Sequence, residues 1–320
     1  MEGNKLITVK NLKKYFKVPS GFVHAVDGLN FSIAKGTTLG IVGESGCGKS
    51  TLGRVLLRLH DATDGQIIYD GQDITHYNAK QLRELRKRMQ MIFQDPSGSL
   101  DPRMCVRDLI GEPLKAYHVC SSRSDYNEQV ATLMEKVGLS PRYRESYSHE
   151  LDGGRRQRIG IGRALALNPE FIVCDEPVSA LDVSIQAQIL NLLMDLQEQN
   201  NLTYVFITHD LSVVKHISDN ILVMYLGQCV EYTSTKSLFS NPLHPYTKGL
   251  LKAVPVASLD AKKISLEVMR GELTSPIDPL PGCRFAARCP HATAACRGED
   301  IPLREVEPGH WVACLFAETL

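Results

Sequence analysis

Residues 43–50 read Gly43-Glu44-Ser45-Gly46-Cys47-Gly48-Lys49-Ser50. This stretch fits the pattern G-x-x-x-x-G-K-[ST] at every position, follows the apolar residues 38–42 and precedes a helical pattern that extends to residue 59. In such a loop, glycines let backbone N–H groups surround phosphates, Lys49 supplies positive charge and Ser50 offers an oxygen to Mg²⁺. The order of strand, loop and helix therefore predicts an α/β fold whose nucleotide site comprises this loop and Thr51.

Strand and helix patterns surround the loop. Residues 6–9 and 26–33 alternate like strands on either side of a polar turn, and residues 66–69 lie between two Asp-Gly turns. From about residue 96 to residue 160 the pattern is mainly helical, most clearly at residues 128–137. The sequence thus predicts an antiparallel β flank and a helical insertion.

Apolar runs resume at residues 171–174 and 204–208, with a helical pattern at residues 185–198 between them. Strands that alternate with helices indicate a parallel sheet with right-handed crossovers. After about residue 255 this rhythm ends, and the chain becomes rich in Pro, Gly and Cys.

Polar side chains follow both apolar runs. Asp175 and Glu176 close the first, and His209 follows the second. Ligands of open α/β sheets gather at this strand edge, so the acidic pair either caps the next element or acts on the nucleotide. In the second case Asp175 helps to hold Mg²⁺ and Glu176 polarises the attacking water. A histidine at a strand end is usually structural, but its position after the acidic strand favours a function for His209.

Composition limits the function classes. The 320 residues include 36 basic and 36 acidic residues, and this zero net charge removes any global electrostatic argument for a nucleic-acid partner. The longest apolar runs, such as residues 221–226, are far shorter than the roughly 18 residues that a spanning helix needs, and the first ten residues lack the order of a signal peptide. We therefore expect a cytosolic chain whose nine cysteines stay reduced.

A second glycine-rich segment lies about 100 residues after the phosphate loop, and it reads Leu151-Asp152-Gly153-Gly154-Arg155. It resembles the signature motif of ABC-type ATPases, although Asp152 and Arg155 stand where that family usually has Ser and Gln. The phosphate loop, Gln94, this segment, Asp175-Glu176, Asp182 and His209 occur in the order of ABC transporter ATP-binding subunits.

This resemblance covers residues 5–255 and implies the P-loop NTPase fold of ABC ATPases, together with roles for several side chains. It implies that Phe16 stacks on adenine, although the neighbouring Tyr15 could serve instead. It also implies that Gln94 couples Mg²⁺ and the attacking water to the membrane partner, and that His209 contacts the γ-phosphate. Across a dimer, the implied contacts with the partner's nucleotide come from Asp152, Gly153, Gly154 and Asp182.

Asp152 leaves two interpretations open. A carboxylate facing the partner's γ-phosphate costs on the order of 4 kcal/mol at 4 Å and an effective dielectric of 20. Alternatively, Asp152 caps the helix that begins near Gly154, and Arg155 or Arg156 neutralises it. The residues that bind this chain's own nucleotide are intact, so the segment predicts asymmetry between the two ATP sites of a dimer.

Four of the cysteines cluster near the C-terminus. Cys283, Cys289, Cys296 and Cys314 give the spacing C-x5-C-x6-C-x17-C. They supply enough thiolates for one 4Fe-4S cluster, whereas structural zinc usually starts from closer pairs. A cluster is the first alternative, and a zinc ion and four free thiols stand equally behind it. The ATPase subunits of oligopeptide and dipeptide importers carry a similar pattern, which is implied to bind 4Fe-4S.

Residues 148–150, 174–184 and 241–247 also resemble that importer subfamily. The resemblance implies an ATP-binding domain at residues 1–255, with its helical insertion at about 96–160, and a C-terminal extension with the four cysteines at residues 256–320. It implies an ATPase at the cytoplasmic membrane face that works with a second, related ATPase chain, two permeases and an extracellular peptide-binding protein. The alternatives are a soluble ABC-type ATPase acting on nucleic acid or ribosomes, and a regulatory subunit with one degenerate ATP site.

Overall fold

The computed structural model describes residues 5–253 and 275–319, and the expected domain boundary at 255/256 lies outside the described residues. The chain divides into two compact units. Described residues of the first unit lie within 5–34, 38–76 and 208–319, and those of the second within 35–37 and 77–207. Each unit contains part of the predicted nucleotide chemistry.

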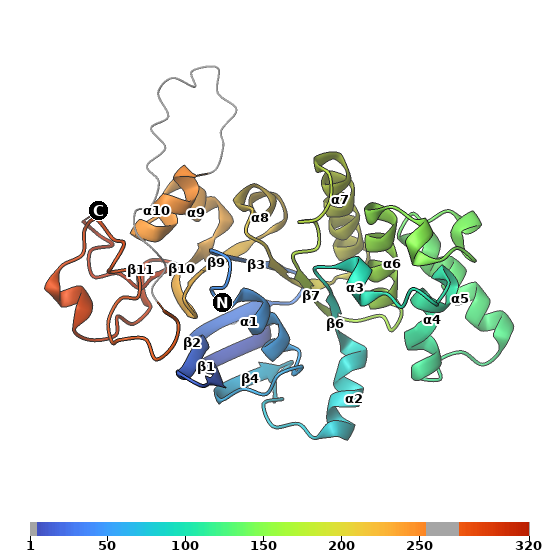
Figure 1. The fold of residues 1–320 in the computed structure, drawn as a ribbon, viewed down its shortest axis with the longest axis horizontal. Helices are drawn as coiled ribbons and strands as arrows, with labels where there is room; N and C mark the ends of the chain where they lie inside the picture. Colours follow the sequence, from blue (N-terminus) through green and yellow to red (C-terminus); the bar gives the residue numbers. More distant parts are fainter. Residues whose placement is uncertain (1–4, 254–274, 320) are drawn as a thin grey trace, which may run out of the picture. The chain divides into compact units, whose positions relative to one another are not determined.

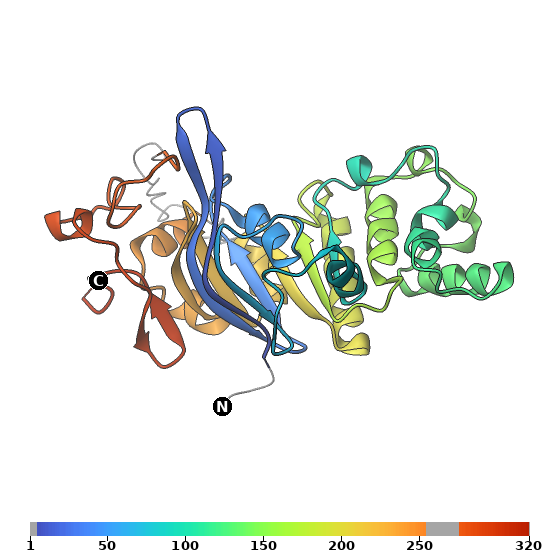
Figure 2. The same cartoon turned by 90° about the horizontal axis from the view of Figure 1, so that it is seen from below.

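The first unit contains the predicted antiparallel flank (Figures 1 and 2). Strands β1 (Lys5–Val18) and β2 (Gly21–Ala34) form the long hairpin drawn in dark blue in Figure 2. Strand β4 (Asp64–Tyr69) pairs antiparallel with β1, and β5 (Gln72–Asp73) completes the sheet. The strands are longer than the alternation predicted, because β-bulges let pairing continue past the points where the alternation breaks.

A second set of strands in this unit has the order β11-β12-β10-β9-β3. Strand β3 (Thr38–Val42) runs parallel to β9 (Asn220–Tyr225), the apolar run that is too short to span a membrane. Strand β10 (Gln228–Ser234) pairs antiparallel with both β9 and β12 (His310–Val312). Strand β11 (Arg304–Glu307) therefore belongs to a sheet that continues into the cysteine-rich region.

Short helices complete the first unit, and they are α1 (Lys49–Leu56), α8 (Leu211–Ile217), α9 (Thr235–Ser240), α10 (Pro245–Lys252) and the 3₁₀ helix η4 (Ala294–Arg297). The prediction that the helix after the loop reaches residue 59 was wrong. It ends at Leu56, and Arg58 has a φ of 54°, a left-handed conformation that cannot continue a right-handed helix.

The second unit combines three parallel strands with the predicted helical insertion. Strands β6 (Met89–Ile92), β7 (Phe171–Asp175) and β8 (Thr203–Ile207) pair in register. Every residue of β7 and β8 is buried, which is why the sequence there shows continuous apolar runs. Helix α7 (Val183–Asn200) extends the predicted helix at both ends.

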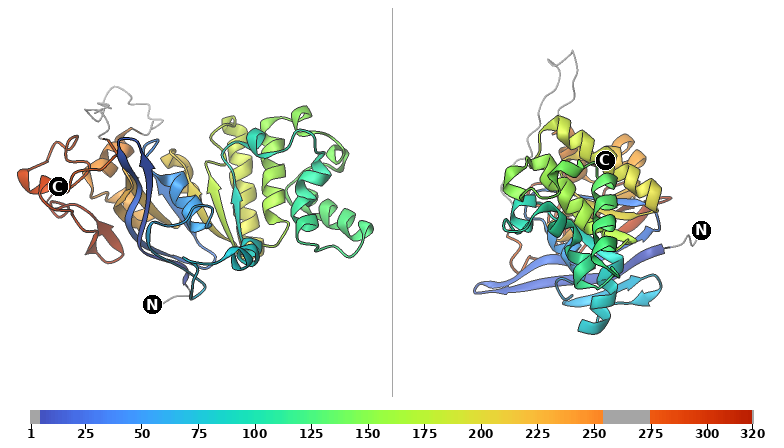
Figure 3. Two further views of the ribbon diagram at one scale, coloured as in Figure 1. Left: turned by 60° about the horizontal axis from the view of Figure 1, so that its bottom comes forward. Right: turned by 90° about the vertical axis from the view of Figure 1, so that its right-hand side faces the viewer.

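The other helices of this unit include the group drawn in green in Figure 3, and they are α2 (Ala79–Arg88), α3 (Pro96–Ser99), α4 (Val106–Ala116), α5 (Arg123–Lys136) and α6 (Gly153–Leu165), with the 3₁₀ turns η1 (Pro141–Tyr143) and η2 (Ser148–Glu150). Within residues 5–253 and 275–319, no helix has the length and apolar character that crossing a membrane requires.

Candidate functional site

The phosphate loop joins β3 to α1 in the first unit. Gly48 precedes the helix with a φ of 104°, and a Cβ there would lie 1.9 Å from the carbonyl oxygen of Ala25. A Cβ on Gly43, whose φ is 153°, would lie 2.2 Å from the carbonyl oxygen of Met224. Both positions therefore exclude any side chain, and the loop keeps its backbone close to the neighbouring strands.

Lys49 is held inside the loop. Its side-chain Nζ donates hydrogen bonds to the carbonyl oxygens of Gly43 (2.8 Å) and Glu44 (2.9 Å), and the residue is only 5% exposed. Ser45 and Gly46 are exposed at the tip, and Ser50 and Thr51 are half-buried in the first turn of α1. Cys47 is buried, and burial raises the pKa of its thiol.

The two candidates for the adenine contact lie side by side on β1. Tyr15 stacks on His24 at 3.9 Å between ring centroids, and its hydroxyl donates to Asp27. Phe16 is half-buried and meets His60 edge to face at 5.7 Å. The hydroxyl of Tyr15 thus belongs to a polar cluster, whereas the Phe16 ring can contact adenine only through apolar atoms. The adenine role of Phe16 stays a prediction.

The second unit brings two of the predicted catalytic residues together. The amide Nε2 of Gln94 donates a hydrogen bond to Oε2 of Glu176 at 3.1 Å. Asp175 ends β7 and is 1% exposed, whereas Glu176 is half-buried with a φ of 46°. A non-glycine residue held in the left-handed region costs energy and is typical of functional sites. The strand end therefore aims Glu176 differently from Asp175, although the two are adjacent in sequence.

Asp152 caps helix α6. One carboxylate oxygen accepts a hydrogen bond from the backbone N–H of Arg155 at 2.8 Å, and the Arg155 guanidinium donates to the other. Both features match the second interpretation of this residue: a helix cap neutralised by Arg155. A Cβ on Gly154 would lie 2.7 Å from a side-chain carbon of Ile185, so this glycine lets α6 approach α7 closely.

Asp182 and His209 are both exposed, and their roles stay predictions. Asp182 precedes α7, and its side chain makes no capping hydrogen bond. His209 follows β8 and belongs to the first unit, with Lys49. Gln94, Asp175 and Glu176 belong to the second unit.

Two residues that the sequence analysis did not single out contact the phosphate loop. The hydroxyl of Tyr246 accepts a hydrogen bond from the backbone N–H of Glu44 at 2.8 Å, and Arg288 forms a bidentate ion pair with the Glu44 carboxylate. Arg288 lies 244 residues after Glu44. No local pattern in the sequence could have indicated either contact.

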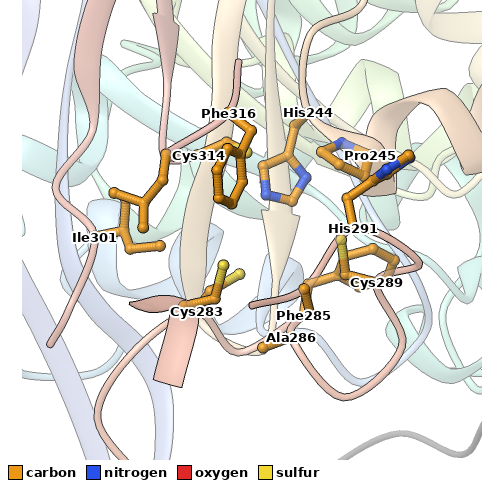
Figure 4. A pocket seen from close by; sticks show the side chains of 13 residues that line it. His244, Pro245, Cys283, Phe285, Ala286, Cys289, His291, Ile301, Cys314 and Phe316 are labelled. Carbon is orange, nitrogen blue, oxygen red and sulfur yellow. The ribbon is translucent and has the colours of Figure 1, made fainter. Parts of the chain in front are cut away.

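The four C-terminal cysteines line one small cavity of about 20 Å³, with His244 and Phe285 also in its wall (Figure 4). Burial raises the pKa of the Cys283 thiol to about 11 and also raises the pKa of Cys289 and Cys314. Among the described residues, no three His, Cys, Asp or Glu side chains are arranged to hold a single metal ion. All nine cysteines are described, and none forms a disulfide.

The cysteine spacing left two metal groups open, a 4Fe-4S cluster and a zinc ion, which differ in how far apart their ligands lie. One zinc ion needs its ligands around a single point, which the cysteines do not provide. In a cubane cluster each of the four thiolates binds a different iron, so the four ligands lie farther apart than the ligands of one zinc ion. The structure shows four thiols on one cavity, and the metal group that they hold stays a prediction.

Comparisons with known proteins agree with these features. Residues 26–179 match the family described as "ABC transporter", and residues 230–296 match "Oligopeptide/dipeptide transporter, C-terminal region". Among solved structures, the dimeric structure of MJ0796, a bacterial ABC transporter cassette, has a TM-score of 0.66 and 28% sequence identity. It covers 72% of this chain and 98% of its own.

Curated relatives match along almost the whole length. The oligopeptide transport ATP-binding protein AppF of Bacillus subtilis is 51% identical over 97% of this chain and 96% of its own length. The oligopeptide transport ATP-binding protein OppF of Salmonella typhimurium is 49% identical over 98% of this chain and 93% of its own. The chain therefore belongs to the ABC transporter family, in the group of oligopeptide transport ATP-binding proteins.

Proposed function

We propose that this chain is the ATP-hydrolysing subunit of an ABC importer for oligopeptides or dipeptides, at the cytoplasmic face of the cell membrane. The observation that carries this function is the 51% identity to an oligopeptide transport ATP-binding protein over 97% of the chain. The intact phosphate loop and the Gln94–Glu176 contact support hydrolysis. Neither a soluble ATPase acting on nucleic acid or ribosomes nor a purely regulatory subunit is favoured by these relatives.

In this proposal the phosphate loop and Thr51 hold the ATP phosphates, and Phe16 contacts adenine. Ser50, Gln94 and Asp175 would hold Mg²⁺, and this ion would neutralise charge on the transferred phosphoryl group. Glu176 accepts a proton from the attacking water, while His209 contacts the γ-phosphate. The hydrogen bond from Gln94 supports this role because it orients the Glu176 carboxylate.

Transport requires partners. We assign Asp152, Gly153, Gly154 and Asp182 to the nucleotide of a second ATPase subunit, which is a related but different chain. ATP binding closes this dimer and hydrolysis reopens it, and the movement drives two permeases that an extracellular peptide-binding protein supplies. Residues 1–255 form the ATP-binding domain, with its helical insertion at about 96–160, and residues 256–320 form the C-terminal extension.

The extension holds a 4Fe-4S cluster through Cys283, Cys289, Cys296 and Cys314. Support comes from the cavity that all four cysteines line. The cluster's contribution is structural: it joins segments that are 31 residues apart, counted from 283 to 314.

Reconstitution tests the main function. The chain is assembled with its partner ATPase, permeases and binding protein in liposomes, and ATP turnover and uptake of a labelled peptide are measured. Glu176→Gln should reduce both by at least about a hundredfold, because the general base is lost, while ATP binding persists. Glu198→Gln, an exposed acid on α7, is the matched control and should change neither rate. Undiminished turnover in Glu176→Gln would contradict the catalytic role, and ATP-driven uptake of another cargo instead of peptide would contradict peptide import.

The cluster has its own test. Protein purified without oxygen should be brown and contain iron and acid-labile sulfide, and Cys289→Ser should lose both. Cys120→Ser, in the second unit, should retain them. Colourless protein loaded with zinc would contradict the cluster.

A further inference from the structure

We propose that Arg288, in the C-terminal extension, is a positioning residue for the phosphate loop: it neutralises Glu44 and so allows the loop to bind a polyanion. This inference rests on the proposed ATP site. It adds a residue far from the nucleotide motifs to the residues on which ATP affinity depends. The contacts that carry it all lie within the first unit.

The ion pair has the geometry of a specific contact. The two terminal nitrogens of Arg288 donate to the two carboxylate oxygens of Glu44 at 2.8 and 3.1 Å. The Arg288 side chain is 8% exposed and that of Glu44 is 22% exposed, so water screens the pair only partly. A bidentate, mostly buried pair of this kind fixes both direction and distance, unlike a single surface contact.

Arg288 is itself held by an anchor in the core. Phe285 is 2% exposed and packs edge to face on Tyr225 at 5.3 Å between centroids. It also contacts Tyr246 at 5.4 Å, and the Tyr246 hydroxyl accepts the Glu44 backbone N–H. The extension therefore contacts the Glu44 carboxylate directly through Arg288, and through Phe285 it packs against Tyr246, which contacts the Glu44 backbone.

The segment between the anchor and the ion pair is a tight turn. The backbone N–H groups of Arg288 and Cys289 both donate to the carbonyl oxygen of Phe285, at 2.9 and 3.0 Å. On the other side of the anchor, Arg284 donates to the carboxylate of Asp27 and to the carbonyl oxygen of Leu226. The position of Arg288 is thus fixed from both ends of the turn.

The charge of Glu44 explains why the contact matters for function. This carboxylate stands in a loop whose task is to surround phosphates, next to the Gly43 and Lys49 contacts. Without a counter-charge, it would repel bound triphosphate and would also compete for the Lys49 ammonium group. Arg288 removes both effects, because its guanidinium stays charged at any physiological pH.

A double-mutant cycle tests the proposal. Binding of a fluorescent MgATP analogue is titrated on the purified full chain, with ATP turnover of the assembled complex as a second measurement. Arg288→Gln should weaken ATP affinity about tenfold by leaving one uncompensated charge near the phosphates, with a smaller change in kcat. Glu44→Gln is the second single variant of the cycle and gives the reference affinity without the carboxylate. The double variant should bind ATP within about threefold of Glu44→Gln, because no uncompensated charge is then left. Arg304→Gln, which removes an exposed ion pair with Glu318 in the same extension, is the matched control.

Every outcome of these measurements supports or contradicts the proposed role of Arg288. Unchanged affinity in Arg288→Gln would overturn the inference, as would a double variant that binds no better than Arg288→Gln or an equal loss in Arg304→Gln. If Arg288→Gln cannot be purified, Arg288→Lys is measured instead, since it keeps the charge but loses the bidentate geometry. We expect its ATP affinity to fall about threefold, and an unchanged affinity would overturn the inference. Wild-type protein that fails to bind or hydrolyse ATP would instead refute the proposed function itself.

Discussion

Two carboxylates stand in segments that face phosphate in the proposed function, and each has an arginine beside it. Glu44 pairs with Arg288, and Asp152 pairs with Arg155. The second pair lies within one helical turn, so the sequence could suggest it as one of two interpretations. The first joins residues 244 positions apart, and such a contact depends on tertiary packing that no local pattern encodes.

The Asp152 pair gives a prediction for the composite site. Arg155→Gln should reduce ATP turnover of the assembled complex several-fold, because the Asp152 carboxylate is then unpaired near the partner's γ-phosphate. Asp152→Ser should stay within about twofold of the wild type, since serine keeps the helix cap. Turnover by the purified complex measures both.

The control for this prediction is Arg142→Gln, because Arg142 and Arg155 both lie over the ring of Tyr143, at 4.7 and 4.8 Å. Its turnover should match the wild type. The double variant Asp152→Ser/Arg155→Gln should recover activity. If it remains as slow as Arg155→Gln alone, the arginine acts in some way other than neutralising Asp152.

At the scale of elements, the strands that carry the nucleotide motifs could be predicted because they are buried on both faces. β3, β7 and β8 consist of apolar runs or nearly so. β10 could not be predicted in the same way, because it buries the charged Glu231 completely. No pattern in the sequence indicated that β11 and β12, which lie far from β10 along the chain, belong to the same sheet as β10.

Glu231 connects three segments of the first unit. Its carboxylate accepts hydrogen bonds from the backbone N–H groups of Leu243 (2.8 Å) and His244 (2.9 Å), and it contacts Nε2 of the buried His310 at 2.7 Å. Burial alone would raise the pKa of Glu231, but the bonds from His310 and from the two backbone groups outweigh it and hold the pKa below that of an ordinary glutamate. The folded state therefore favours the charged carboxylate.

Glu231→Gln should accordingly lower the free energy of unfolding at pH 7 by about 2–4 kcal/mol, because the amide leaves buried donors without their charged acceptor. A carboxylate whose pKa is lowered by folding stabilises the folded state at pH values above its unfolded pKa. This stabilisation is lost as the pH falls through its folded pKa. The difference between wild type and Glu231→Gln should therefore shrink below about pH 4.5. Urea unfolding at pH 7 and at lower pH measures it.

The matched control is Glu307→Gln. Glu307 approaches the other ring nitrogen of His310 at 3.8 Å, but its side chain is 53% exposed. We expect almost no change in its unfolding free energy at either pH, because solvent screens an exposed charge. A loss equal to that of Glu231→Gln would show that burial is not the cause.

At the scale of the whole molecule, the chain offers half of each composite site of the proposed dimer. Its phosphate loop and Glu176 serve its own nucleotide, whereas residues 151–155 serve the partner's in the proposed dimer. Because its net charge is zero, this chain exerts no net long-range repulsion on a partner chain.

Blocking hydrolysis should therefore trap the closed dimer. Glu176→Gln mixed with the partner ATPase and MgATP should elute as a dimer in size-exclusion chromatography with light scattering, because closure proceeds while the resetting step does not. With MgADP the same mixture should remain monomeric. Lys49→Ala, which removes the ammonium group that meets the phosphates, should stay monomeric with either nucleotide. If Glu176→Gln dimerises equally well with MgADP, hydrolysis does not reset this dimer. If Glu176→Gln pairs with itself as readily as with the partner ATPase, the heterodimer is not the preferred pair.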